Sequence, residues 1–177
     1  MAVQGPIVIT GASSGIGAAC AQYLDALGFT VWAGVRSTQD GEALTRLTSS
    51  RLRVLMLDVT DPASIEAARK TLAEATRDTG LAGLVNNAGI SVAGPLELLP
   101  LSEVRTQFEV NVIGVLAVTQ ALLPLLRLAR GRIVNISSIA GLAATPFLGA
   151  YCSSKFALEA MSDALRLELA PWGISVS

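Results

Sequence analysis

A tyrosine and a lysine four residues apart, Tyr151 and Lys155, are the pair in this sequence best suited to proton chemistry. On a helix this spacing places both side chains on one face, one turn apart. A free tyrosine keeps its proton up to a pKa of roughly 10, and a lysine cation within a few Å favours the phenolate and lowers that pKa. Such a pair can donate and accept a proton near neutral pH. The same spacing also fits a surface tyrosine whose ring packs on a lysine stem, so the pair alone does not define a site.

A second motif lies near the N-terminus, where Thr10–Gly17 has the sequence T-G-A-S-S-G-I-G. It follows the apolar run Pro6–Ile9 and precedes the helix-like run Ala18–Leu24, which predicts a strand, a glycine-rich turn and a helix. Glycines permit a tight turn and the close approach of a phosphate, and the new helix offers unpaired N–H groups and the positive end of its dipole. The motif indicates a pyrophosphate site, with an ordinary glycine turn as the alternative. Its spacing, G-x-x-x-G-x-G, differs from the G-x-G-x-x-G of other dinucleotide-binding folds.

Composition excludes several other functions. The sequence has no histidine, so Ser13 in the hydrolase-like motif Gly11–Gly15 has no histidine to act as its general base. The two cysteines, Cys20 and Cys152, are isolated from each other, and we therefore expect no metal site. The net charge is −1 and the 13 lysines and arginines are scattered, which argues against nucleic-acid binding.

Apolar strand-like runs alternate with amphipathic stretches, a pattern typical of stacked βαβ units. The expected strands are Ile7–Thr10, Thr30–Val35, Arg53–Asp58, Leu84–Asn86, Arg132–Ile136 and Ile174–Ser177. The expected helices lie near Ser14–Leu27, Gly41–Thr48, Pro62–Thr79, Leu101–Leu128 and Ala150–Pro171. With 177 residues, 51% of them hydrophobic, we predict an α/β fold: one doubly wound parallel sheet with helices on both faces, ending in its sixth strand.

Local signals support some of these boundaries. Asp61 followed by Pro62 is a good helix start, and Gly28 is a suitable C-terminal cap for the first helix. The longest apolar stretch, Val110–Ala129, approaches membrane-spanning length. It contains polar and charged residues such as Asn111 and Arg127, so we predict a core or interface helix and no membrane span. The chain starts almost directly on its first strand, without a secretory signal, and we expect a cytoplasmic protein.

Polar residues and a glycine follow the ends of successive predicted strands. They are Gly11, Arg36, Asp58, Asn87 and Ser138. In open parallel sheets, ligands bind outside the carboxyl ends of the strands, at the point where the strand order reverses. We therefore predict that these residues converge on one functional site.

Taken together and in this order, the motifs resemble those of the short-chain dehydrogenase/reductase family. Asp58, Asn86–Gly89, Asn111 and Asn135–Ser138 match further family positions in sequence order. The resemblance covers essentially the whole chain and implies a single NAD(P)-binding Rossmann domain over residues 1–177. The segment Val31–Arg36 and the long apolar helix are most similar to the steroid- and retinol-dehydrogenase-like branch, which implies an apolar ketone or secondary alcohol as substrate.

The resemblance also implies a reaction centre. Tyr151 would give a proton to the substrate carbonyl oxygen during reduction, or take one from the hydroxyl during oxidation. Lys155 would lower the pKa of Tyr151 and bind the nicotinamide ribose. Ser138 lies 13 positions before Tyr151, the family's usual offset, and would orient the substrate oxygen, whereas strand alternation points Ser137 the other way. Asn111 would link Lys155 through water to solvent; the alternative is a buried polar residue that bends its helix.

The implied cofactor contacts come from the glycine-rich turn and later strand ends. Asn87 would line the cofactor, whereas Asn86 would brace neighbouring strands. Asp58 would contact the adenine edge, with a plain turn residue before Asp61 as the alternative. The full expected cofactor set is Gly11, Ser13, Ser14, Gly15, Ile16, Gly17, Arg36, Asp58, Val59, Asn87, Ala88, Gly89, Tyr151 and Lys155.

The choice of cofactor depends on the end of the second strand. Enzymes that use NAD usually place an acidic residue there, where it accepts hydrogen bonds from the ribose. Here Val35 takes that position and Arg36 follows, and a guanidinium suits a 2′-phosphate. We therefore expect NADP(H) in preference to NAD(H). Ser14 departs from the frequent NADP pattern, in which a basic residue lies inside the turn.

The resemblance implies a homodimer or homotetramer that pairs through the helix at Leu101–Leu128 and the helix bearing Tyr151. Family members continue beyond the position of Ser177 with another strand, a loop and a helix that cover the substrate. A second hypothesis follows, in which the chain is a nucleotide-binding or oligomerising fragment that keeps the catalytic residues but lacks the lid needed to use them.

Overall fold

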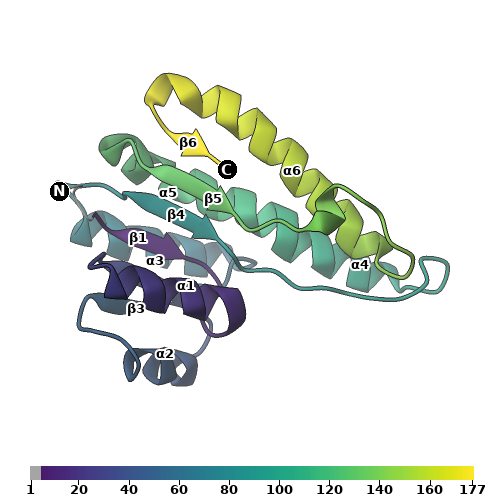
Figure 1. The fold of residues 1–177 in the computed structure, drawn as a ribbon, viewed down its shortest axis with the longest axis horizontal. Helices are drawn as coiled ribbons and strands as arrows, with labels where there is room; N and C mark the ends of the chain where they lie inside the picture. Colours follow the sequence, from purple (N-terminus) through teal and green to yellow (C-terminus); the bar gives the residue numbers. More distant parts are fainter. Residues whose placement is uncertain (1–4) are drawn as a thin grey trace.

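A computed structural model describes residues 5–177 and contains one six-stranded sheet (Figure 1). The strands are β1 (Ile7–Ile9), β2 (Val31–Val35), β3 (Leu52–Met56), β4 (Gly83–Asn86), β5 (Arg132–Asn135) and β6 (Ser175–Val176). Every neighbouring pair is parallel, and the order is β3-β2-β1-β4-β5-β6. The chain therefore crosses over between β3 and β4, and the strand order reverses beside β1. This confirms the predicted doubly wound α/β fold.

Helices cover both faces of the sheet. They are α1 (Gly15–Ala26), α2 (Thr38–Thr45), α3 (Pro62–Ala75), α4 (Leu101–Phe108), the π turn η1 (Glu109–Gly114), α5 (Val115–Ala129), the 3₁₀ turn η2 (Ile139–Gly141), α6 (Gly149–Leu169) and the 3₁₀ turn η3 (Ala170–Trp172). Alternate strand residues face opposite layers, since Ile9 packs with α1 and α2 while Val8 packs with α3, α5 and α6. The sheet is thus buried between two apolar layers, as its continuous hydrophobic strands require.

Three helix predictions need correction. The third helix ends at Ala75 rather than near Thr79, because Thr76 leaves the helical conformation. The second helix begins at Thr38 rather than near Gly41, because the Ser37 hydroxyl caps it by accepting a hydrogen bond from the Asp40 N–H at 3.2 Å. The long helix from Leu101 is not continuous, because the π turn η1 interrupts it. Such bulges occur mostly as single turns and often at functional sites.

The predicted helix signals at the other boundaries are confirmed. Asp61 caps α3, and its Oδ1 accepts a hydrogen bond from the Ala63 N–H at 2.9 Å, with Pro62 in the first turn. Gly28 has φ +91° directly after the end of α1, a conformation that side chains with a Cβ rarely adopt.

Among the described residues, one helical stretch, Leu101–Ala129, is long and apolar enough to cross a membrane. Its second half, α5, packs against α3, and Val118, Leu122 and Leu126 are buried in the core layer beneath the sheet. These contacts support the interpretation of α5 as a core helix.

A buried polar network crosses the sheet below the strand ends. The Nδ2 of Asn86 donates to Oγ1 of Thr119 at 3.0 Å and to Oδ1 of Asn135 at 2.9 Å. Asn135 in turn donates through Nδ2 to Oγ of Ser162 at 2.8 Å. Asn86 therefore joins β4 to β5 and to α5, which confirms its predicted role as a brace between strands.

Candidate functional site

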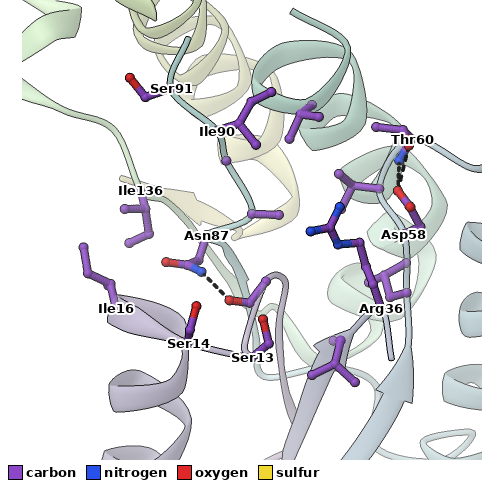
Figure 2. A pocket seen from close by; sticks show the side chains of 18 of the residues that line it. Ser13, Ser14, Ile16, Arg36, Asp58, Thr60, Asn87, Ile90, Ser91 and Ile136 are labelled. Carbon is purple, nitrogen blue, oxygen red and sulfur yellow. Dashed lines mark hydrogen bonds between the residues drawn. The ribbon is translucent and has the colours of Figure 1, made fainter. Parts of the chain in front are cut away.

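A cavity of about 600 Å³ opens at the carboxyl ends of the strands (Figure 2). Its wall is formed by the glycine-rich turn, the segments after β2, β3, β4 and β5, and the first turns of α6. The predicted residues that line it are Gly11, Ser13, Ser14, Ile16, Arg36, Asp58, Val59, Asn87, Ala88, Gly89, Tyr151 and Lys155. Both sequence motifs therefore contribute to one cavity, although they are separated by most of the chain.

Four predicted residues do not line this cavity: Gly15, Gly17, Asn111 and Ser138. The cavity also has wall residues that the sequence analysis did not select, among them Thr60, Ile90, Ser91, Thr106, Ile136 and Ser137. Thr60, Ile90 and Ser91 continue a recognised motif by one or two residues, because the chain runs on along the cavity after the strand ends. Ile136 and Ser137 lie inside the motif Asn135–Ser138, and Thr106 lies on α4, where no motif marks it.

Two glycines shape the turn between β1 and α1. Gly15 has φ +55°, so a side chain there would strain the backbone at the start of the helix. A Cβ on Gly17 would overlap the Gly11 carbonyl oxygen and the Asn87 side-chain nitrogen. Asn87 fixes this arrangement, since its Nδ2 donates to the carbonyl oxygens of Thr10 at 3.0 Å and Gly11 at 2.9 Å. Gly17 thus acts by allowing close packing, which explains why it lies behind the cavity wall.

The turn suits a pyrophosphate. Ser13 and Ser14 are exposed at the cavity, and the backbone at the start of α1 offers the unpaired N–H groups of a helix N-terminus. The first turn of α1 contains no acidic residue that would repel a phosphate. A Cβ on Gly11 would lie 2.8 Å from the Ala88 Cα, so the turn packs directly against the segment after β4. The residues present therefore fit a dinucleotide.

Arg36 and Asp58 lie on the same side of the cavity, after the ends of β2 and β3 (Figure 2). Oδ1 of Asp58 accepts hydrogen bonds from the Thr60 N–H at 2.9 Å and from the Thr60 hydroxyl at 2.7 Å. These two bonds, helped by the nearby charge of Arg36, hold the pKa of Asp58 below its usual range. Asp58 is therefore a turn-forming carboxylate as well as a wall residue, so both of its alternative roles are compatible with the geometry.

Tyr151 and Lys155 lie in the first turns of α6, on the face that borders the cavity. The Lys155 Nζ lies 5.8 Å from the centre of the Tyr151 ring and donates a hydrogen bond of 2.7 Å to the Ile136 carbonyl oxygen. Burial lowers the pKa of Lys155, and the charge of Glu159 opposes that shift. The spacing of the two residues thus places both side chains on one face of α6 at the cavity.

Asn111 is buried in the π turn η1, and its side chain contacts backbone rather than the cavity. Its Oδ1 accepts from the Ile90 N–H at 2.9 Å, and its Nδ2 donates to the Ile90 carbonyl oxygen at 3.0 Å and to Oγ of Ser154 at 3.1 Å. Ser154 donates onward to the Tyr151 carbonyl oxygen at 2.7 Å. Asn111 therefore joins the segment after β4 to the helix that carries Tyr151, and its role in a proton relay stays a prediction.

The two serines after β5 differ in their surroundings. Because β5 ends at Asn135, strand alternation does not extend to Ser137 or Ser138. Oγ of Ser138 accepts a hydrogen bond from the Ala140 N–H at 3.1 Å and caps η2. Ser137 lines the cavity, and its buried Oγ has no hydrogen-bond partner among the described residues. The structure thus adds Ser137 to the residues of the cavity wall, although its Oγ itself is buried.

A doubly wound parallel sheet with a glycine-rich turn where the strand order reverses defines a nucleotide-binding α/β domain of the Rossmann type. The sequence matches the family model described as short chain dehydrogenase over residues 6–177. The chain belongs to the short-chain dehydrogenase/reductase family.

Its curated relatives include retinol dehydrogenase 5 from Mus musculus, which is 46% identical over 97% of this chain and 54% of the relative. Human 17-beta-hydroxysteroid dehydrogenase type 6 is also 46% identical over 97% of this chain and 54% of that protein. The mitochondrial D-beta-hydroxybutyrate dehydrogenase of Mus musculus is 43% identical, with 97% and 52% of the two chains covered. This chain thus spans about half the length of these relatives.

Solved structures show the same fold. A short-chain dehydrogenase from Streptomyces avermitilis superposes with a TM-score of 0.92 at 36% identity, over 99% of this chain and 64% of the other. ElxO with NADP bound superposes with a TM-score of 0.91 at 27% identity, over 98% and 71% of the two chains. An NAD⁺-bound xylitol dehydrogenase matches with a TM-score of 0.91 at 26% identity, over 98% and 68%.

Proposed function

We propose that this chain forms the cofactor-binding and catalytic part of an oxidoreductase that interconverts a ketone and a secondary alcohol with NADP(H). The observation that carries the proposal is the shared cavity, which has the glycine-rich turn on one side and the Tyr151–Lys155 pair on the other. NADP(H), when bound, supplies or accepts the hydride. The protein would then contribute binding, orientation and control of the proton.

The cofactor would be held by groups along the strand ends. Ser13, Ser14 and the start of α1 would bind the pyrophosphate, and Arg36 would bind a 2′-phosphate. Asp58 and Val59 would lie beside the adenine. The segment Asn87–Gly89 and the Lys155 ammonium would position the nicotinamide half next to the reaction centre.

The proton would be moved by Tyr151. Its hydroxyl would give a proton to the carbonyl oxygen of a ketone and take one back from an alcohol, and the Lys155 ammonium would bind the nicotinamide ribose. Ser138 would hydrogen-bond the substrate oxygen, and Asn111 would connect Lys155 to solvent through water. No metal takes part in this proposal.

An apolar substrate is supported by the loops beside α6. Leu142 and Phe147 are exposed by 69% and 66%, and Leu96 from the segment after β4 by 64%. A hydrogen bond of 2.7 Å from the Gly94 N–H to the Phe147 carbonyl oxygen joins the two loops just before Tyr151. Relatives named retinol and hydroxysteroid dehydrogenases agree with apolar alcohols as the substrate class.

Two further proposals concern the whole protein. We propose a homodimer or homotetramer paired through α5 and α6, for which sedimentation over a range of concentrations is the measurement; a constant monomer mass would contradict it. A cytoplasmic location also stays a proposal, and one relative is named a mitochondrial enzyme. Fractionation of cells that express the protein separates these locations.

The proposed function is tested by fluorescence titration with NADPH and NADH, followed by turnover of a panel of apolar ketones. We expect saturable binding, with NADPH tighter, and ketone-dependent oxidation of NADPH. Binding without turnover of any ketone would instead support the nucleotide-binding fragment. The absence of binding to either nucleotide would contradict the enzyme and the nucleotide-binding fragment, and would leave the oligomerising fragment as the hypothesis for this chain.

The predicted cofactor preference depends on Arg36. Because hydrogen bonds to charged groups contribute about 1.5–3 kcal/mol, Arg36→Ala should weaken NADPH binding by about 10- to 150-fold. Binding of NADH should change by no more than about twofold, because NADH lacks the 2′-phosphate. Parallel titrations of the two nucleotides measure this difference. A variant that weakens both nucleotides equally would show that Arg36 acts on the fold rather than on the phosphate.

Alanine variants of the two serines separate their roles. Since Ser138 is the proposed partner of the substrate oxygen, Ser138→Ala should lower kcat/KM for a ketone about 100-fold, as loss of a donor at a reacting oxygen does. Ser137→Ala should change it by no more than about threefold. Steady-state kinetics of both variants provide the comparison. The reverse order would assign the role to Ser137, which lines the cavity.

A further inference from the structure

A buried glutamine, Gln107, holds the backbone segment that leads from β4 along the cavity. Its side chain is 0% exposed, in the last turn of α4. Nε2 donates a hydrogen bond of 2.7 Å to the Ile90 carbonyl oxygen, and Oε1 accepts one of 2.7 Å from the Val92 N–H. The amide nitrogen and the amide oxygen of Gln107 are therefore both hydrogen-bonded to the backbone segment Ile90–Val92.

This geometry reproduces the bonding of a parallel strand. In a parallel ladder, one residue bonds to a carbonyl and an N–H that belong to positions two apart on the neighbouring strand. Gln107 makes the same pair of bonds, to Ile90 and Val92, although β4 has already ended at Asn86. A single side chain thus takes the place of a neighbouring strand where the sheet no longer continues.

The segment held in this way borders the reaction centre. Ile90 and Ser91 line the cavity together with Tyr151 and Lys155 (Figure 2 labels Ile90 and Ser91). Asn111 is hydrogen-bonded to the N–H and the carbonyl oxygen of Ile90, and its Nδ2 also donates to Ser154. The Ser154 hydroxyl in turn donates to the Tyr151 carbonyl oxygen. Ile90 is thus anchored twice, whereas the Val92 N–H has Gln107 as its partner.

We infer that Gln107 is a positioning residue, which fixes Ile90–Val92 and thereby sets the distance between the substrate and Tyr151. Because Gln107 lies behind the cavity wall, it acts through this backbone and touches neither substrate nor cofactor. The inference rests on the proposed function for its effect on turnover. Its structural part, the anchoring of Ile90–Val92, stands on the hydrogen bonds alone.

Gln107→Met keeps the length and apolar volume of the side chain but removes both hydrogen bonds. The matched control is Gln39→Met, at an exposed position on α2 away from the proposed interface. Amide hydrogen exchange followed by NMR should show the Val92 N–H exchanging at least about 10-fold faster in Gln107→Met, with core amides of β1 and β4 unchanged. Exchange in Gln39→Met should match the unsubstituted protein.

Kinetics provide the functional readout. In Gln107→Met, kcat/KM for a ketone should fall about 10-fold or more through a misplaced substrate, while the Kd for NADPH stays within about twofold. Unchanged kcat/KM in a variant whose Val92 amide has become exposed would overturn the positioning role. Absence of turnover in the unsubstituted protein would contradict the proposed function, and Val92 exchange would still decide whether Gln107 anchors the segment.

A measurement on the unsubstituted protein tests the inference even if Gln107→Met does not fold. If the bond to Gln107 holds, the Val92 amide should exchange at least about 100-fold more slowly than in an unstructured peptide. Exchange at the unstructured rate would overturn the inference without any substitution.

Discussion

Tyr151→Phe should abolish most ketone turnover while leaving the cofactor site intact. The variant keeps the aromatic ring on α6 but removes the hydroxyl that holds the proton, and general acid–base catalysis contributes about 10²- to 10⁴-fold. We therefore expect kcat to fall by at least about 100-fold, with the Kd for NADPH within about twofold. Steady-state kinetics and fluorescence titration measure the two quantities.

Tyr23→Phe is the matched control, since Tyr23 is 66% exposed on α1 and does not line the cavity. Its kinetics should equal those of the unsubstituted protein. Near-normal turnover in Tyr151→Phe would refute the assignment of Tyr151 as the proton donor. Loss of NADPH binding in that variant would instead show that the phenol is needed to form the cofactor site.

Gly17→Ala should disrupt the cofactor site by displacing the glycine-rich turn. The added Cβ has no room, because the Gly11 carbonyl oxygen and the Asn87 amide occupy that space. Overpacking of this kind typically costs about 1–3 kcal/mol. If the turn moves to relieve the overlap, the Kd for NADPH should rise by about 5- to 150-fold. If the helix moves instead, the free energy of unfolding should fall by about 1–3 kcal/mol.

Gly83→Ala tests whether any added methyl group in the sheet has this effect. A Cβ at Gly83 would lie 3.6 Å from the Ile7 side chain, an ordinary contact distance. NADPH binding by this variant should stay within about twofold of normal. Equal losses in the two variants would mean that the turn is not specifically constrained at Gly17. Denaturant unfolding and nucleotide titration together measure both possible effects.

The positions of the strands and of most helices along the chain could be predicted, because the signals for them are local in sequence. Capping residues such as Asp61 and the positive-φ glycine Gly28 act through their immediate neighbours in sequence. A buried Asn111 that bends its helix is one of the expected alternatives, but the π turn itself could not be predicted, because Asn111 bonds to Ile90, which is 21 positions away in sequence. Helix propensity is a preference of each residue for the helical conformation and contains no information about such distant partners.

In the candidate site, too, residues within local motifs could be predicted, whereas residues that depend on distant partners could not. Residues inside the two motifs were predicted to share a site, and they share one cavity. Gln107 was missed because a glutamine in a helix has no distinguishing pattern until its backbone partners, 15 and 17 positions earlier, are known. Ser138 is favoured by its offset from Tyr151, whereas Ser137 is set aside by strand alternation, a rule that stops applying where β5 ends, at Asn135.

The amide pair between β4 and β5 has a consequence for folding specificity. Asn86 and Asn135 are direct partners in the strand register, and each is buried. A slip of β5 by two residues would keep the apolar faces correctly oriented, so hydrophobic burial alone would not oppose it. The slip would separate the two amides and leave buried polar groups unpaired, at a cost of about 1–3 kcal/mol for each group. Since the segment that follows β5 brings Ser137 to the cavity in the native register, this pair of asparagines selects the alignment in which that segment and Tyr151 share one cavity.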